Sequence, residues 1–206
     1  MIRNIIFDLG GVIINLDMEA TARAFRALGM TDFDFHYSQA KQSGLFDDFD
    51  CGRISPQEFR NGLKKQLPEG TSNEAIDAAW NAMLLDVPEE RLDVLNSLKG
   101  KYRLFLLSNT NEIHVTAFSA ALEKKYGFAD FSSYFENWYY SCRIGKRKPD
   151  ANAFLHVLEE NQLRPEETVF IDDSRQHVEG AIRTGIRGKW LEPGMEIGNF
   201  LAGILS

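Results

Sequence analysis

The feature that most constrains this chain is its first apolar run, residues 2–7, which is followed by Asp8 and then by Gly10 and Gly11. A short run rich in isoleucine and phenylalanine is typical of a buried strand, and glycines let the backbone turn where a side chain would clash. We therefore expect Asp8 at the carboxyl end of a buried strand, the edge at which open parallel sheets bind ligands. A carboxylate there serves as a nucleophile, a metal ligand or both, although a strand-end aspartate more commonly caps a helix or a turn.

The length and charge of the chain limit the classes of protein that it fits. With 206 residues it has room for one domain, or for one domain with a smaller insert. A net charge of −7 disfavours nucleic acid and anionic membrane surfaces as main partners, but a local cationic pocket can still bind a small anion.

The cysteines and the apolar runs bear on where the protein works. Cys51 and Cys142 fit neither a disulfide framework nor zinc-ligand spacing, so we expect free thiols in a reducing compartment. The first apolar run is too short for a signal peptide, and no run approaches the length of a membrane span. These features predict a cytoplasmic protein without a membrane partner, which we expect to be a monomer or a weak homo-oligomer.

Two segments after the glycines are predicted to surround the first strand end. Residues 12–17 are rich in β-branched side chains and predict a short hairpin or flap beside Asp8. Residues 31–87 look helical throughout, with no convincing strand, and the sequence from Ser55 carries the serine, proline and glutamate of a capped helix start. We expect residues 16–88 to form a helical insert.

Beyond this insert, helical and strand patterns alternate. Apolar periodicity predicts helices at residues 91–99, 118–126, 151–161 and 177–184, and strands at residues 103–107, 138–142, 168–171 and 187–191. This alternation is typical of a parallel sheet with helices on both faces. The predicted fold is therefore α/β, with a Rossmann-like core formed by residues 1–15 and 89–206.

Polar side chains follow three of the predicted buried strands, and these are Asp8, Ser108, Asn109, Asp172 and Asp173. Because parallel strands end at one edge of a sheet, we expect these side chains to gather there, joined by Lys148 from the loop before the third of these strands. Clustered carboxylates repel one another unless a cation joins them. Carboxylate oxygens suit Mg²⁺, which completes its shell with water and phosphate oxygens, while a lysine and a serine can hold a phosphoryl group.

These motifs resemble those of the haloacid dehalogenase-like hydrolase superfamily. The matching segments, in the family's order and approximate spacing, are residues 7–12, residues 107–110, Lys148 with Pro149, and residues 170–173. The insert at residues 16–88 falls where that family places a helical cap, and residues 46–55 resemble the cap of a bacterial subgroup that includes sugar-1-phosphate phosphatases.

The resemblance implies a role for each candidate residue. Asp8 is implied to be the nucleophile that becomes an aspartyl-phosphate, and Ser108 and Lys148 are implied to bind the phosphoryl group. Asn109 would orient the phosphate or the loop. The implied cofactor is Mg²⁺, and its implied ligands are Asp8, the backbone carbonyl of Gly10, Asp172 and Asp173. The implied substrate is a small phosphorylated metabolite, a hexose 1-phosphate more than others.

Gly10 departs from the pattern of the family's phosphatases, which carry an acid/base aspartate at this position. Loss of such a group typically costs about 10²- to 10⁴-fold in rate. One interpretation is a phosphatase for substrates with a fair leaving group, such as a sugar 1-phosphate. The alternatives are a non-catalytic phosphosugar-binding or interaction protein on the same scaffold, and a metal-independent haloacid dehalogenase.

The remaining polar candidates are predicted to lie outside the site. His114 is expected to be a surface or capping residue, and His177 lacks ligand-spaced partners. Among the acidic residues of the insert, Asp17 is the best candidate for a replacement proton donor from the flap. We favour solvated surface charge as the interpretation of Asp47, Asp48 and Asp50. For Arg143, Lys146 and Arg147, solvated surface charge and a basic patch that attracts anions are equally good explanations.

Overall fold

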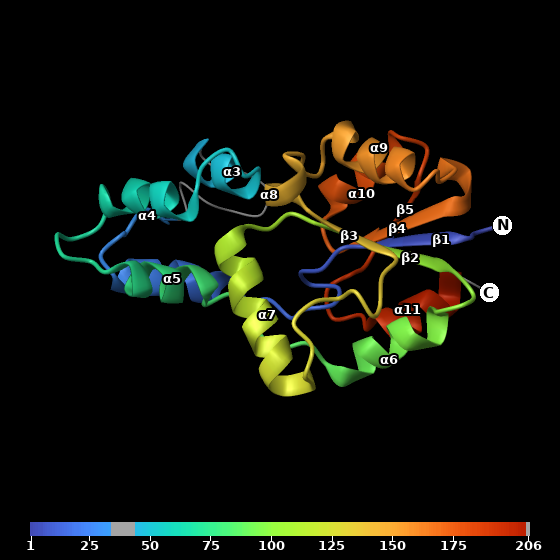
Figure 1. Cartoon of the computed structure of the whole chain (residues 1–206), viewed down its shortest axis with the longest axis horizontal. Coiled ribbons are helices and arrows are strands. Elements are labelled where there is room, and N and C mark those ends of the chain that lie inside the picture. The colour runs from blue at the N-terminus through green and yellow to red at the C-terminus, as the bar shows by residue number, and fades with distance from the viewer. Residues whose placement is uncertain (34–43, 205–206) are drawn as a thin grey trace.

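A computed structural model of the chain, which describes residues 1–33 and 44–204, is built on one five-stranded parallel sheet (Figure 1). The strand order is β3-β2-β1-β4-β5. The strands are β1 (Asn4–Phe7), β2 (Arg103–Ser108), β3 (Asn137–Tyr140), β4 (Thr168–Asp172) and β5 (Arg187–Trp190). The predicted α/β class is confirmed, and the first apolar run of the chain is the central strand.

The register of β1 explains why the candidate residues meet at one edge. Phe7 pairs with Leu106 on one side and with Ile171 on the other, and the backbone N–H of Asp8 donates to the carbonyl of Ile171 at 2.9 Å. Asp8 therefore leaves the sheet level with the last residue of β4.

Alternation along the strands divides the core into two layers. Ile5 and Phe7 pack with α6 (Glu89–Leu98), α7 (Glu112–Tyr126) and α11 (Ile197–Ile204). Ile6 points to the other face and packs with α9 (Ala151–Glu160) and α10 (Arg175–Ile182). The two groups of helices lie on opposite sides of the sheet in Figure 1.

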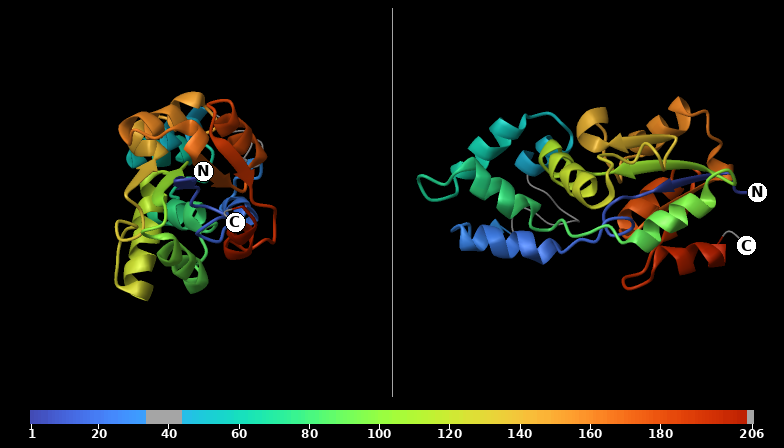
Figure 2. Two further views of the ribbon diagram at one scale, coloured as in Figure 1. Left: turned by 90° about the vertical axis from the view of Figure 1, so that its right-hand side faces the viewer. Right: turned by 60° about the horizontal axis from the view of Figure 1, so that its bottom comes forward.

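Among the described residues, four further helices stand off one end of the sheet (Figures 1 and 2). They are α1 (Met18–Ala27), α3 (Gly44–Asp50), α4 (Pro56–Lys64) and α5 (Asn73–Asn81). They share an apolar cluster of their own, rich in aromatic rings, whose largest members include Phe25, Phe46, Phe59 and Trp80. The predicted capping box at Ser55 is present, with reciprocal bonds to Glu58.

The segment after β1 differs from the predicted hairpin. Residues 9–14 close into a tight turn, in which the N–H groups of Ile13 and Ile14 both donate to the carbonyl of Leu9. Residues 15–17 then run beside residues 83–86, with one isolated antiparallel bridge between Leu16 and Leu84. The insert is therefore helical apart from this short pairing at its base; its residues 34–43 lie outside the described part of the chain.

Two boundaries and two further elements also differ from the predictions. The strand predicted at residues 138–142 ends at Tyr140, because the chain turns into the short helix α8 (Ser141–Ile144). Helix α7 begins at Glu112, six residues before the predicted start, because the side chain of Asn111 caps it. Helix α11 and a 3₁₀ turn at Pro165–Glu167 were not predicted. No helix in the described ranges is both long and apolar enough to cross a membrane.

Candidate active site

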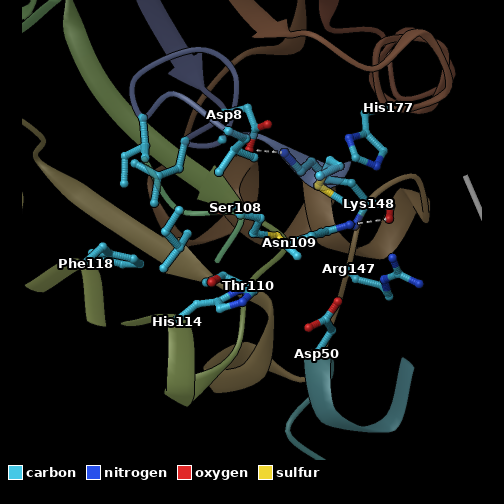
Figure 3. A pocket seen from close by; sticks show the side chains of 17 residues that line it. Asp8, Asp50, Ser108, Asn109, Thr110, His114, Phe118, Arg147, Lys148 and His177 are labelled. Carbon is cyan, nitrogen blue, oxygen red and sulfur yellow. Dashed lines mark hydrogen bonds and ion pairs between the residues drawn. The ribbon is translucent and has the colours of Figure 1, made fainter. Parts of the chain in front are cut away.

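Lys148 lies at the centre of the candidate site and joins two carboxylates from neighbouring strands. Its Nζ donates to Asp8 Oδ1 and to Asp172 Oδ2, each at 2.7 Å, and its side chain is completely buried. Figure 3 shows Lys148 reaching towards Asp8 across the pocket. A buried ammonium is stable here because both of its partners are charged and hydrogen-bonded.

The end of β2 holds the Lys148 segment in place. The amide of Asn109 donates to the carbonyl of Lys148 at 2.8 Å and accepts from its backbone N–H at 2.9 Å. Ser108, which is 3% exposed, lines the same pocket. The strand ends thus bring Asp8, Ser108, Lys148 and Asp172 together, as predicted, and Asn109 contacts the loop backbone.

Asp173 completes a cluster of three carboxylates. One oxygen from each of Asp8, Asp172 and Asp173 lies within 4.8 Å of the others. The Asp173 carboxylate lies against Gly11, where an added Cβ would come within 2.1 Å of Oδ2, and Gly11 has a φ of +74°. The second glycine of the motif is therefore required both by its backbone conformation and by the carboxylate beside it.

The electrostatics of this cluster favour a divalent cation. Burial, together with Asp172, raises the pKa of Asp8 to about 6, even though Lys148 acts in the opposite direction. Burial and the neighbouring carboxylates raise the pKa of Asp173 to about 7. Burial also acts to raise the pKa of Asp172, but Lys148 and His177 lower it overall. When all three carboxyls are ionised, they exceed the charge of the one ammonium by two negative charges, which a hard divalent ion can neutralise.

Gly10 differs from Gly11 in what surrounds it. Its backbone does not require glycine, because its φ lies outside the left-handed region. An added Cβ would lie 2.6 Å from Cδ1 of Leu16. The side chain of Leu16 therefore fills the space in which a side chain at position 10 would begin. Asp17, the proposed substitute proton donor, instead caps α1 and pairs with Arg23 at 2.9 Å.

Two histidines line the pocket although the sequence analysis placed them outside the site. The Nδ1 of His177 lies 3.1 Å from both carboxylate oxygens of Asp172. His114 stacks on Trp80, with ring centroids 4.7 Å apart, and its Nε2 lies 3.1 Å from the Trp80 carbonyl oxygen. Burial lowers the pKa of His114 to about 4, so this histidine is neutral.

The prediction that Asp50 belongs to the solvated surface is also wrong. Asp50 is 4% exposed rather than solvated, it accepts a hydrogen bond from Asn111 at 3.0 Å, and it lines the pocket. Arg147 lines the pocket as well and pairs with Asp47 at 2.7 Å. No local sequence signal marks Asp50 or Arg147, because their positions depend on contacts between segments 61 and 100 positions apart. For His177, its place five residues after a strand-end carboxylate was a usable signal.

Comparison with known proteins agrees with this geometry. A model of the haloacid dehalogenase-like hydrolase family matches residues 2–185. The D-ribitol-5-phosphate phosphatase of Bacteroides thetaiotaomicron is 31% identical over 178 residues, which cover 86% of each chain.

Solved structures of similar proteins share the whole fold. A variant of a haloacid dehalogenase family enzyme from Bacteroides thetaiotaomicron, in complex with magnesium and inorganic phosphate, has a TM-score of 0.91 and 34% identity, covering 98% of this chain and 99% of that one. A predicted hydrolase of the same family from Porphyromonas gingivalis has a TM-score of 0.89 and 35% identity, covering 100% and 98%. The chain described here therefore belongs to the haloacid dehalogenase-like hydrolase family.

Proposed function

We propose that this protein is a Mg²⁺-dependent phosphatase that hydrolyses a small phosphate monoester through an aspartyl-phosphate on Asp8. The observation that carries the proposal is the buried Lys148 bridge between Asp8 and Asp172, beside a third carboxylate. The similarity to a ribitol-5-phosphate phosphatase and to a magnesium- and phosphate-bound structure supports the same reaction class.

The proposed magnesium ligands are Asp8, Asp172, Asp173 and the backbone carbonyl of Gly10. The close approach of the three carboxylates and the raised pKa values of Asp8 and Asp173 fit a divalent cation at this place. When bound, the ion would neutralise charge on the transferring phosphoryl group.

The residues of the chain have complementary roles in the proposed reaction. A carboxylate oxygen of Asp8 attacks phosphorus, the bond from phosphorus to the ester oxygen breaks, and the leaving alkoxide takes a proton from water, because Gly10 supplies no acid. Ser108 and Lys148 hold the phosphoryl oxygens during the transfer. Water then attacks the aspartyl-phosphate, which releases inorganic phosphate and restores Asp8. Asn109 keeps the Lys148 backbone in place.

Residues 16–88 are proposed as a cap that covers this chemistry. Met18, Asp50, Met83 and Leu84 from this segment line the same pocket as Asp8. A cover that excludes bulk water strengthens the electrostatic interactions in the site and selects the substrate.

Two substrate types remain as proposals within this reaction class. The absence of an acid/base side chain at Gly10 favours a hexose 1-phosphate, whose anomeric oxygen is a fair leaving group. The similarity to a ribitol-5-phosphate phosphatase favours a polyol phosphate instead. Comparing turnover of glucose 1-phosphate, glucose 6-phosphate and ribitol 5-phosphate separates the two, because the leaving-group argument fails if the two hexose phosphates react equally fast.

The test of the function is a phosphate-release screen with and without Mg²⁺, repeated on Asp8→Asn. We expect Mg²⁺-dependent release by the wild-type protein and none above background by the variant. Binding without hydrolysis across the panel would instead support the non-catalytic alternative, and halide release from a haloacid without Mg²⁺ would support a dehalogenase.

A further inference from the structure

The pocket beside Asp8 has a second polar end that the proposed hydrolysis does not use. Its charged residues are Asp50, the last residue of α3, and Arg147, which immediately precedes Lys148. Figure 3 shows both on the side of the pocket away from Asp8 and His177, with Ser108 and Asn109 between. A substrate whose phosphate lies against Asp8 would extend its other end towards this pair.

Arg147 offers a hydrogen-bond donor that is already buried. Its Nη1 donates to Asp47 at 2.7 Å, which fixes the guanidinium against α3. Its Nε is buried and has no hydrogen-bond partner among the residues that the structure describes. A buried donor without an acceptor carries a free-energy cost. Arg147 lines the pocket, and a rotation of its side chain that presents this N–H to an acceptor atom of a bound molecule would remove that cost.

Asp50 offers the complementary acceptor. Its carboxylate is 4% exposed and is oriented by Asn111, whose amide donates to Oδ1 at 3.0 Å. An ionised carboxylate accepts hydrogen bonds and cannot donate them. A hydroxyl group both donates and accepts, so neighbouring hydroxyls on one molecule can donate to Asp50 and accept from the Nε of Arg147.

Ion pairs hold this end of the pocket in place. Arg147 and Arg53 both pair with Asp47, and Arg53 also pairs with Asp48. The apolar side chains of the wall offer a hydroxyl no hydrogen bond, and they are Leu9, Ile14, Leu16, Met18, Met83, Leu84 and Phe118. Thr110 and His114 are polar and line the pocket as well.

We propose that Asp50 and Arg147 bind hydroxyl groups on the uncharged end of the substrate. The pocket would then select phosphate monoesters of polyols or sugars over simple alkyl phosphates. This inference rests on the proposed phosphatase function and adds to it the residues that recognise the hydroxyl groups of the substrate.

The first experiment uses the wild-type protein with Mg²⁺ and a matched pair of esters. Ribitol 5-phosphate and pentyl phosphate both carry five carbons and a primary phosphate, and only the former has hydroxyls. We expect kcat/KM to be about tenfold to a hundredfold higher for the former, as one or two hydrogen bonds to charged groups would give. Comparing kcat/KM for glucose 1-phosphate, as a third substrate, with that for ribitol 5-phosphate shows whether the pocket prefers hydroxyls on a ring or on an open chain.

Variants then assign this preference to the two residues. Arg147→Met keeps the apolar stem and removes the donor, and Asp50→Asn keeps the shape and removes the charge. Each is expected to raise KM for ribitol 5-phosphate about tenfold or more and to leave kcat/KM for pentyl phosphate within about threefold. Arg53→Met is the matched control, because it removes a guanidinium from the same ion cluster but not from the pocket, and it should leave the preference unchanged.

Several results would overturn the inference. One such result is an equal kcat/KM of the wild-type protein for the two matched esters. Another is an equal loss of kcat/KM for both esters in Arg147→Met, which would place Arg147 at the phosphate. If Arg147→Met does not fold, Arg147→Lys keeps the charge near Asp47 without the Nε donor and is read in the same way.

Calorimetric binding of the two esters to Asp8→Asn separates this inference from the proposed function. A preference for ribitol 5-phosphate there supports the hydroxyl site even if the wild-type protein releases no phosphate. Equal binding of the two esters refutes the hydroxyl site even if hydrolysis occurs.

Discussion

Because Gly11 has no side chain, it leaves room for the carboxylate of Asp173. In Gly11→Ala the new Cβ would lie 2.1 Å from Asp173 Oδ2 and the backbone would keep a φ of +74°, so Asp173 must move away from Asp8 and Asp172. We expect at least tenfold weaker Mg²⁺ binding, the order of effect reported for lost supporting contacts at metal sites, measured by calorimetry.

Gly70→Ala is the control for backbone strain. Gly70 also has a positive φ, of +86°, but no described heavy atom lies within 4 Å of its added Cβ. It should therefore cost only about 1–2 kcal/mol of stability and leave Mg²⁺ binding unchanged. Equal loss of Mg²⁺ affinity in the two variants would contradict the role given to the Asp173 contact.

A substitution at Gly10 can show whether a missing proton donor is what limits turnover. The backbone at Gly10 tolerates a side chain, and among the described residues Leu16 alone has atoms within 4 Å of an added Cβ. In the double variant Gly10→Asp with Leu16→Ala, we expect turnover of ribitol 5-phosphate to rise by about tenfold or more, because general acid catalysis helps poor leaving groups most. Turnover of p-nitrophenyl phosphate, whose leaving group needs no proton, should change little. A similar change for both esters would argue against a missing acid.

The residues that sequence analysis could and could not place differ in what positions them. Asp8, Ser108 and Asp172 follow apolar strands, and the parallel topology brings all strand ends to one edge, so local patterns were sufficient. Asp50 and Arg147 depend on how α3 docks beside the loop before Lys148, and no periodicity encodes that docking.

At the scale of elements, the N-terminus of α7 connects the core to the insert. Asn111 caps α7 by accepting from the His114 N–H, accepts from the indole N–H of Trp80 at 3.2 Å, and donates to Asp50 at 3.0 Å. All of these side chains are buried. The Asn111 side chain therefore caps α7 and also hydrogen-bonds to residues of α3 and α5. Because this cap and not the apolar pattern sets the start of α7, the helix begins before its first apolar repeat.

We expect Asn111→Ala to destabilise the protein by about 2–4 kcal/mol, the sum of a lost cap and of two buried side-chain hydrogen bonds lost with it. Ser72→Ala is the matched control, since Ser72 caps α5 through a single exposed bond to the Ala75 N–H, and it should cost about 1 kcal/mol. Urea unfolding measures both. Equal losses would mean that the bonds from Asn111 to the insert contribute nothing.

At the scale of the whole molecule, the apolar clusters follow two different sequence patterns. The segments with alternating strand and helix patterns contain the sheet and the clusters on its two faces, and the long helical stretch supplies most of a separate aromatic cluster. The pairing of residues 15–17 with residues 83–86, which closes the base of the insert, was missed because two short extended segments carry no strand pattern of their own. Residues 15–17 and 83–86 connect the insert to the rest of the chain, so any movement of the insert would depend on them.

Proton and magnesium binding at the carboxylate cluster should be coupled in the stability of the whole protein. The pKa values of Asp8 and Asp173, about 6 and about 7, lie above the ordinary value of 3.8. The stability that these two groups contribute without metal is therefore fully present below about pH 4 and is lost as the pH rises through 6 and 7. Mg²⁺ binds the deprotonated carboxylates, so its affinity should rise by about tenfold to a hundredfold per pH unit below pH 6 and level off above about pH 8.

Melting temperatures with and without Mg²⁺ between pH 5 and 8 measure this coupling. The increase in Tm caused by Mg²⁺ should be small at pH 5 and large at pH 8, since ligand binding stabilises the fold in proportion to the logarithm of its affinity. In Asp173→Asn the dependence between pH 6 and 7 should become shallower, because the group with the higher pKa no longer titrates. An increase in Tm that is the same at every pH would show that the carboxylates are already ionised without the metal, and it would remove the electrostatic reason for placing a divalent ion among them.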